Sequence, residues 1–296
     1  MKNAVLCKID GMKYTGYITS LYMLLFLLSC ETEQPDIPQT ETNPKRVGTN
    51  IVLSLQFAEL LNDIAFEAAT SLVVDSSKIE HEGKYIAACS DTNLTQKGNG
   101  QTEIEIQFHS CTLEGSINLD GQLVVEVRGN TLEQGAFFTV RAEDLRVDDY
   151  VLSGSMDIQH AGYTQDETMI FKTRVKDLKY MGIVGYGVTF SGEFDREFKS
   201  GYHDNIFYDG EAAYENDEFG LTGGGEIFGA DFDSTMVLID KELEKRNECV
   251  YFSRGVITLT TKGKPSRTLN WGDGSCDNKV KMTTNKGEYE IELMNL

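Results

Sequence analysis

The sequence has few positive charges, few prolines and no long apolar run. Lys and Arg number 27 against 47 Asp and Glu, a formal net charge of -20 at pH 7. Such a chain repels phosphate backbones, which excludes nucleic-acid binding as its main role. Only 4 prolines accompany 28 glycines without a period, so the chain is neither collagen-like nor proline-rich. The apolar run at residues 21–28 is far shorter than the about 20 residues that a membrane-spanning helix needs.

Enzyme motifs are also missing. The sequence contains no Gly-x-Ser-x-Gly, His-Glu-x-x-His, phosphate loop or dinucleotide fingerprint. Asp and Glu are so frequent that no catalytic pair can be chosen without distances in space. We therefore predict no catalytic residue, no cofactor and no metal ligand. The histidines have no motif around them and are predicted to be surface or loop residues; they are His81, His109, His160 and His203.

The first residues have the pattern of an export signal. Lys2, Lys8 and Lys13 precede the apolar run, which ends in Leu-Leu-Ser-Cys at residues 27–30. This ending resembles the lipobox of bacterial lipoproteins, which implies cleavage after residue 29 and a lipid on Cys30. An ordinary secretory signal and a single-pass anchor are the alternatives. Either Met1 or Met12 could be the true start.

A change of pattern divides the remaining chain. Residues 30–48 hold three of the four prolines and no apolar period, and we predict a flexible tether. The β-rich domain is predicted over residues 49–296, beginning with an amphipathic helix at 50–74. Its apolar positions recur every three or four residues and so form one face of the helix, and Glu59, Asp63 and Glu67 lie off this apolar face.

Beyond residue 100 the apolar period becomes two. Ile104, Ile106 and Phe108 alternate with polar residues, and several later segments behave alike. This alternation predicts antiparallel strands with one solvated face, in a meander that forms a sandwich or a curled sheet. An Asp, Ser or Thr before Gly recurs along these strands, as at Gly121 and Gly192, and predicts hairpin turns at some positions and bulges at others.

Four cysteines remain after Cys7 leaves with the signal and Cys30 takes the lipid. In an oxidising compartment an even count fits two disulfides, and three pairings are possible. We favour Cys89–Cys111 and Cys249–Cys276, because the members of each pair are close in sequence. A zinc site is the rival, but the chain has no Cys-x-x-Cys.

The segment 271–278 reads Trp-Gly-Asp-Gly-Ser-Cys-Asp-Asn. It resembles a turn near the C-terminus of an uncharacterised group of Bacteroidota lipoproteins. The resemblance implies a lipobox, a helix and glycine-punctuated strands, and an envelope location, but no chemistry. The segment's Asp side chains are predicted to stabilise a tight turn, with calcium binding as the alternative.

These features predict an all-β, lipid-anchored protein of the bacterial outer membrane, facing the periplasm or the cell surface. Its partners would be the membrane, through Cys30, and a glycan or envelope protein. A binding or interaction module is the favoured function. The alternatives are a glycan hydrolase with an Asp/Glu pair and a structural component of an outer-membrane assembly. Aromatic residues concentrated at 180–214, with Trp271, are predicted to pack in the sheet rather than to stack on sugars.

Overall fold

The computed structural model describes residues 44–74, 85–86, 89–113, 117–182, 187–201, 217–229, 232–246, 249 and 251–294. The predicted signal at 1–29, Cys30 and the tether up to residue 43 lie outside the described residues. The described part contains one α-helix, α1 (Pro44–Val74), a 3-10 turn at Gly98–Gly100 and a 13-stranded sheet. The strands are β1 (Ser90–Lys97), β2 (Gln101–Thr112), β3 (Asn118–Arg128), β4 (Phe137–Val147), β5 (Tyr150–Tyr163), β6 (Met169–Met181), β7 (Gly187–Ser200), β8 (Glu218–Gly229), β9 (Phe232–Arg246), β10 (Arg254–Thr261), β11 (Arg267–Asp273), β12 (Lys279–Thr284) and β13 (Gly287–Glu292).

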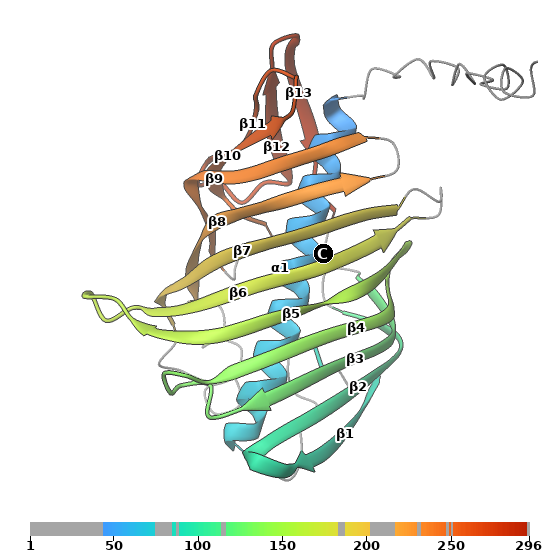
Figure 1. Ribbon diagram of the computed structural model, residues 1–296, viewed down its shortest axis with the longest axis vertical. Coiled ribbons are helices and arrows are strands. Elements are labelled where there is room, and N and C mark those ends of the chain that lie inside the picture. The colour runs from blue at the N-terminus through green and yellow to red at the C-terminus, as the bar shows by residue number, and fades with distance from the viewer. Residues whose placement is uncertain are drawn as a thin grey trace, which may run out of the picture. The chain divides into compact units, whose positions relative to one another are not determined.

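The strands form one open antiparallel meander. Each strand pairs with the strands that precede and follow it in the sequence, and β1 and β13 form the two edges (Figure 1). The predicted all-β class with one N-terminal helix is confirmed. Of the two predicted architectures, the structure has the single sheet and not the sandwich.

The alternation of apolar and polar residues along each strand decides which face of the sheet is buried. In β2, Ile104, Ile106 and Phe108 are fully buried, whereas Glu103 and Glu105 between them are only partly covered. The inward residues of all strands form one core with α1, which crosses the strands on this face (Figure 1). The opposite, outer face carries the charged side chains, as the period of two predicts.

Helix α1 begins earlier than the sequence indicated. It starts at Pro44 and not at residue 50, so residues 44–48 are helical and not part of a tether. Proline fits the first helical position, where its missing N–H costs nothing. Val47 is buried, and a Cβ added to Gly48 would lie 2.7 Å from Ile291 Cδ1 and Met282 Sδ. Packing against β12 and β13, which local sequence does not reveal, therefore extends the helix.

A line of bulges crosses the sheet from β2 to β7, and Asp120-Gly121, Ser153-Gly154 and Ser191-Gly192 lie on it, whereas Asp209-Gly210 lies outside the described residues. In β3, Gly121 has a φ of 105° where the register with β4 shifts. Asp120 accepts a hydrogen bond from the backbone N of Ser110, whose φ of 52° marks the bulge in β2. The Ser110 hydroxyl also donates to Asp120, and Ser hydroxyls donate to Asp carboxylates in the same way further along the sheet, from Ser153 to Asp144 and from Ser191 to Asp177. The three Asp-Gly and Ser-Gly dipeptides on this line therefore mark bulges and not hairpin turns.

Candidate functional site

Helix α1 carries a row of polar side chains on one face. Gln56, Glu59, Asp63 and Glu67 recur every three or four residues and so lie above one another. An amphipathic helix ordinarily turns its polar side chains toward solvent. Glu59, Asp63 and Glu67 are instead only 8%, 6% and 7% exposed. Burying three carboxylates is costly unless they are paired, so their partners define the site.

Two positively charged side chains of the sheet lie against this row. Arg196 on β7 is 3% exposed, with its Nη2 2.7 Å from Asp63 Oδ1 and its Nη1 3.5 Å from Glu59 Oε2. Lys245 on β9 places its Nζ 3.4 Å from Asp63 Oδ2. The pairs join positions 133 and 182 residues apart in the sequence, so they fix α1 against the sheet.

Two phenylalanines position Arg196. Its guanidinium carbon lies 3.7 Å from the ring centre of Phe219 and 5.2 Å from that of Phe198, where cation–π attraction offsets part of the cost of burial. Sequence reasoning missed this residue. A signal was present, because Arg196 has the same inward register as Phe194 and Phe198.

A third contact joins the row to residues 85–86. Glu67 accepts hydrogen bonds from the backbone N of Tyr85 at 2.8 Å and from that of Ile86 at 2.6 Å. The Tyr85 hydroxyl donates to Asp63 Oδ2 at 3.1 Å. Asp63 therefore contacts Arg196, Lys245 and Tyr85, and it is the centre of the cluster.

A cavity of about 40 Å³ adjoins this cluster, and both Glu59 and Gln56 line it. A cavity needs a volume of about 10–15 Å³ to hold one water molecule, so this one has room for two or three groups of that size. Its walls combine aliphatic and aromatic side chains, Trp271 among them, with the charged side chains of Asp63 and Lys245. An apolar pocket with a few buried polar groups is the usual form of a ligand site.

Burial sets the protonation behaviour of Glu59. Removal from water raises its pKa above the ordinary 4.5, and the neighbouring negative charge of Asp63 raises it further. Arg196 and Lys245 act in the opposite direction, but burial is the largest cause. Glu59 consequently keeps its proton to a higher pH than an exposed glutamate.

The two predicted disulfides are present. Cys89 is joined to Cys111, and Cys249 to Cys276, with Cα–Cα distances of 5.4 and 5.3 Å. In the C-terminal turn the carboxylates hydrogen-bond locally, since Asp277 Oδ1 accepts from the backbone N of Lys279 at 3.0 Å. These contacts fit the predicted structural role of the turn.

The described aromatic residues of the 180–214 cluster, together with Trp271, lie in the core. Tyr180, Phe190, Phe194 and Phe198 are buried, and Trp271 is 3% exposed. The other aromatic residues of the 180–214 cluster, at 186, 202, 207, 208 and 214, lie outside the described residues. Those that are described follow the packing interpretation.

The histidines differ from one another. His109 is exposed and lies 2.9 Å from Asp91, as predicted for a surface residue. His160 contradicts that prediction, because it is fully buried with its ring 4.9 Å from that of Phe171. Its position in β5 has inward register, which alternation could have revealed. His81 and His203 lie outside the described residues.

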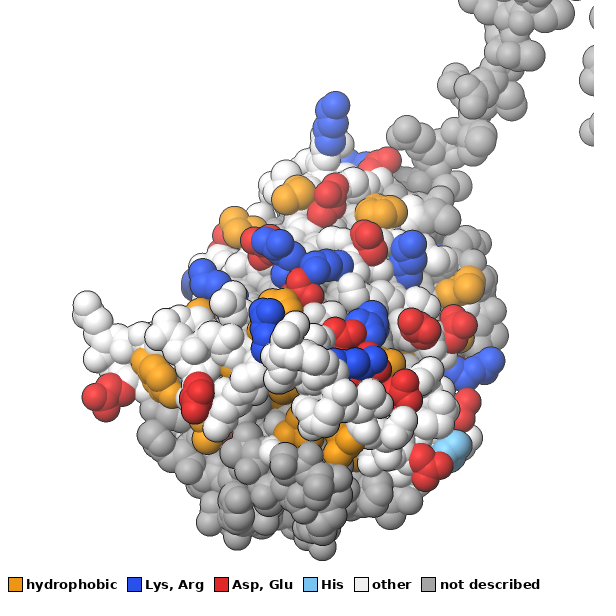
Figure 2. Space-filling model, turned by 60° about the horizontal axis from the view of Figure 1, so that its bottom comes forward, with side chains coloured by type: hydrophobic (Ala, Val, Ile, Leu, Met, Phe, Trp, Pro, Cys, Tyr) orange, Lys and Arg blue, Asp and Glu red, His pale blue; other side chains and the backbone are white. Residues whose placement is uncertain are grey.

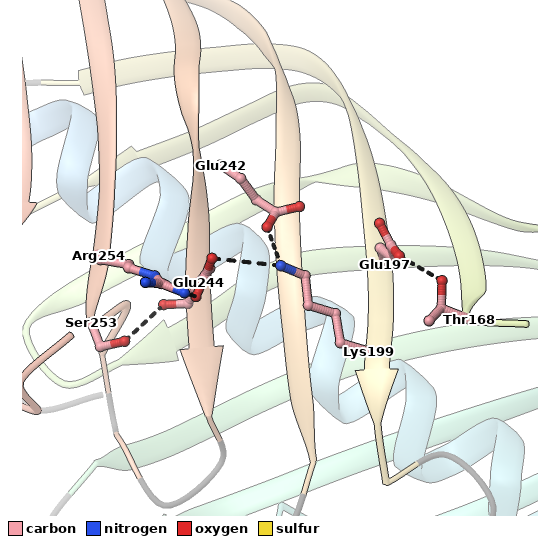
Figure 3. Close-up of polar contacts among 7 residues, drawn as sticks. All are labelled: Thr168, Glu197, Lys199, Glu242, Glu244, Ser253 and Arg254. Carbon is pink, nitrogen blue, oxygen red and sulfur yellow. Dashed lines mark hydrogen bonds and ion pairs between the residues drawn. The ribbon is translucent and has the colours of Figure 1, made fainter. Parts of the chain in front are cut away.

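On the outer face, ion pairs bridge neighbouring strands. Lys199 on β7 contacts Glu242 and lies 3.6 Å from Glu244 on β9, which Arg254 on β10 contacts at 2.5 Å (Figure 3). Acidic and basic side chains are likewise interleaved on the face drawn in Figure 2. These exposed or half-exposed pairs compensate much of the surface charge.

Three large apolar side chains interrupt this charged outer face. Phe228 on β8 and Met236 and Leu238 on β9 are 48%, 54% and 55% exposed. Met236 lies opposite Glu226, and Leu238 lies opposite Gly224, which has no side chain. We call Phe228, Met236 and Leu238 the outer patch.

A second hollow lies beside the C-terminal turn. This open groove of about 470 Å³ is lined by Lys279, Lys281, Glu288 and Glu290, among others. Lys279 pairs with Glu290 at 2.9 Å and Lys281 with Glu288 at 2.6 Å. Since these charges satisfy one another, the groove indicates no ligand.

Comparison with known proteins found no matching family model, no matching curated protein and no matching solved structure. Within the described part of the chain, no three His, Cys, Asp or Glu side chains are grouped as metal ligands. No helix among the described residues combines the length and apolar character that crossing a membrane requires.

Proposed function

We propose that this chain is a lipoprotein of the bacterial outer membrane, anchored through a lipid on Cys30, whose β-sheet domain acts as an interaction module. The observation that carries the anchoring is the short apolar run at 21–28 followed by Ser29 and Cys30. A single acyl chain binds membranes only marginally, so stable anchoring needs more than one. The several acyl chains that bacterial lipoproteins carry at this cysteine would hold the domain firmly.

The disulfides support a location outside the cytoplasm. Cys89–Cys111 and Cys249–Cys276 use all the cysteines that would remain after Cys30 is lipidated and residues 1–29 are removed. Disulfides persist in the periplasm and on cell surfaces and are rare in the bacterial cytosol. The pairing is therefore consistent with an exported domain.

The site favours binding over hydrolysis. Glu59 and Asp63 are the carboxylates nearest the cavity, but Arg196 contacts both of them. A hydrolase also needs room for a sugar ring and a water between its two carboxyl groups. The cavity of about 40 Å³ gives no such room. A glycan hydrolase therefore finds no support in this cluster.

The outer patch favours a protein as the partner. Apolar side chains surrounded by charge are typical of protein contact surfaces. Glu226 and Asp240 lie on the same face beside Met236 and Leu238. A partner with an apolar centre and a basic rim would complement this surface, whereas a second copy of the acidic chain would repel it. The outer patch holds one aromatic side chain, Phe228, and two aliphatic ones, a composition that fits a protein contact better than the stacking of sugar rings.

The proposed anchoring is tested by Cys30→Ala. We expect the variant to move from the membrane fraction to the soluble fraction, because the acceptor thiol for the lipid is lost. Fractionation and metabolic labelling with a fatty acid would measure this, with Cys7→Ala as the matched control that keeps both attachment and label. Firm membrane attachment of the Cys30 variant would contradict the proposal.

A further inference from the structure

Strand β13 leaves one edge of the sheet open (Figure 1). Within the described part of the chain, β13 pairs with β12 on one side and with no strand on the other. The backbone N of Leu293 donates to the carbonyl of Asn278 at 2.8 Å, which makes these two residues a hydrogen-bonded pair. Hydrogen-bonded and non-hydrogen-bonded pairs alternate along an antiparallel ladder. The backbone N–H and C=O groups of Glu288, Glu290 and Glu292 therefore point away from β12, toward the open edge.

Such an edge is a template for one more strand. A row of unpaired backbone N–H and C=O groups pairs readily with another extended chain. In complexes of this kind the main-chain hydrogen bonds supply affinity, and the alternate side chains supply specificity. The side chains along β13 therefore indicate which chain fits.

The outer face of this edge is acidic. Glu288, Glu290 and Glu292 are all exposed on it. Glu288 contacts Lys281 and Glu290 contacts Lys279 on β12, yet the two carboxylate side chains remain 55% and 58% exposed. Each can therefore contact a second cation on the side away from β12. Because cross-strand pairs of opposite charge stabilise a sheet, a strand with Lys or Arg at every second position complements this face.

The inner face of the edge is apolar. Ile291 is buried, whereas Tyr289 and Met294 are only partly covered by the core against which they pack. The side chains of an added strand would alternate between the two faces, so every second one would lie beside Tyr289 or Ile291. Apolar residues at these positions would extend the core and remove apolar surface from water.

A second copy of this chain does not fit the edge. Every outward position of β13 from residue 288 to residue 292 is a glutamate, so pairing two copies of β13 with their outer faces aligned places glutamate opposite glutamate. Like charges directly opposite one another destabilise a sheet. Charged edge residues are a usual protection against pairing between copies. The same charges attract a basic strand, so they select the partner.

We propose that the open edge of β13 binds an extended segment of a partner protein, in which Lys or Arg alternates with apolar residues, as one further antiparallel strand. Its basic side chains lie on the outer face opposite the glutamates, and its apolar side chains lie beside Tyr289 and Ile291. Strand β12, which reads Lys-Val-Lys-Met at 279–282, already meets β13 with this pattern on the other side. The contact is separate from the outer patch and from Cys30, so its test bears on neither.

The test uses the full-length, disulfide-bonded protein and the peptide acetyl-Lys-Val-Lys-Val-Lys-Val-amide. We expect the peptide to slow hydrogen exchange at the amides of Glu288, Glu290 and Glu292, measured by NMR, because each amide then donates to the added strand. The control peptide acetyl-Lys-Lys-Lys-Val-Val-Val-amide has the same charge without the alternation and should not slow it. Unchanged exchange with the first peptide, or equal protection by both, would overturn the proposal. Protection that is already present without peptide and is lost on dilution would show that a second copy occupies the edge, which also overturns it.

N-methylated peptides separate strand addition from simple attraction to an acidic protein. In an antiparallel pair, the residue opposite each glutamate turns its own N–H and C=O groups toward β13. In the proposed register these residues are the lysines of the peptide. Methylation of the lysine backbone nitrogens should therefore abolish binding, whereas methylation of the valine nitrogens should preserve it. If both methylated peptides bind as the parent peptide does, the contact is electrostatic only and the proposal fails.

A pair of variants localises the contact. Glu290→Lys should weaken binding of the parent peptide about tenfold, because an attractive cross-strand charge pair becomes a repulsive one. Glu193→Lys on β7 is the matched control, because it makes the same change of charge in an exposed ion pair, with Arg174, away from the edge. Fluorescence anisotropy of a labelled peptide at constant ionic strength measures both affinities. Equal weakening in the two variants, or unchanged affinity in Glu290→Lys, would refute the assignment to β13.

Discussion

At the scale of single residues, the buried pair Arg196–Asp63 is the contact whose loss costs most. Both side chains are about 5% exposed or less, and removing one partner of such a pair leaves an uncompensated buried charge. Arg174 on β6 makes a similar contact with Glu193 at 2.8 Å, but the two side chains are 60% and 71% exposed. These two arginines form a matched comparison of buried and exposed ion pairs.

We expect Arg196→Met to lower the free energy of unfolding by about 3–5 kcal/mol. Arg174→Met should lower it by about 1 kcal/mol or less, because water screens an exposed pair. Urea unfolding followed by circular dichroism would measure both changes. Similar losses in the two variants would show that burial does not determine the importance of Arg196.

The residues of the site show where sequence reasoning reached its limit. Helical period alone predicted the apolar positions of α1, and they are buried. It could not predict that Glu59, Asp63 and Glu67 are buried too, because their partners are supplied by β7 and β9. The inward register of Arg196 and Lys245 was readable from the alternation, but which helical residues they meet depends on tertiary packing.

At the scale of elements, the bulges explain the repeated glycines. Gly154 in β5 has a φ of 143°, and an added Cβ would lie 2.8 Å from the carbonyl O of Asp177 and from Leu178 Cα. Gly287, at the start of β13, has a similar φ of 136° but nothing within 4 Å of its Cβ position. The sequence indicated that some glycines mark bulges. The contacts between these glycines and aspartates on neighbouring strands could not be predicted without knowing the strand register.

Gly154→Ala and Gly287→Ala would separate backbone strain from steric contact. Both variants force alanine to a positive φ, which costs of order 1–3 kcal/mol. Gly154→Ala should cost a further 1–3 kcal/mol, roughly, because the strands β5 and β6 must move apart. Thermal unfolding of the two variants would measure the difference. Equal losses of stability would contradict the role of Gly154 in close strand contact.

At the scale of the whole domain, one open sheet has to bury a large core without a second sheet. Helix α1 fills the inner face, contacting β3, β4 and β6 and also β12 and β13 near the other edge. The alternation of apolar and polar residues and the one amphipathic helix were enough to predict a sheet with a single helix. They could not distinguish a sandwich from a curled sheet, because both bury one face of every strand. The choice depends on the strand order, which runs without a break from β1 to β13.

The outer face then becomes the surface on which a partner can act, and the outer patch is its least polar part. Photo-crosslinking in living cells, with a photoreactive amino acid at Leu238, should give a discrete adduct with one protein, because apolar side chains half exposed on one face of the sheet favour a specific contact. The same amino acid at Asn93, exposed on the edge strand β1, is the control and should give none. Met236→Lys should abolish the Leu238 adduct without loss of stability, since Met236 is 54% exposed. An adduct that persists in that variant, or that forms equally from Asn93, would show that the outer patch is not the contact surface.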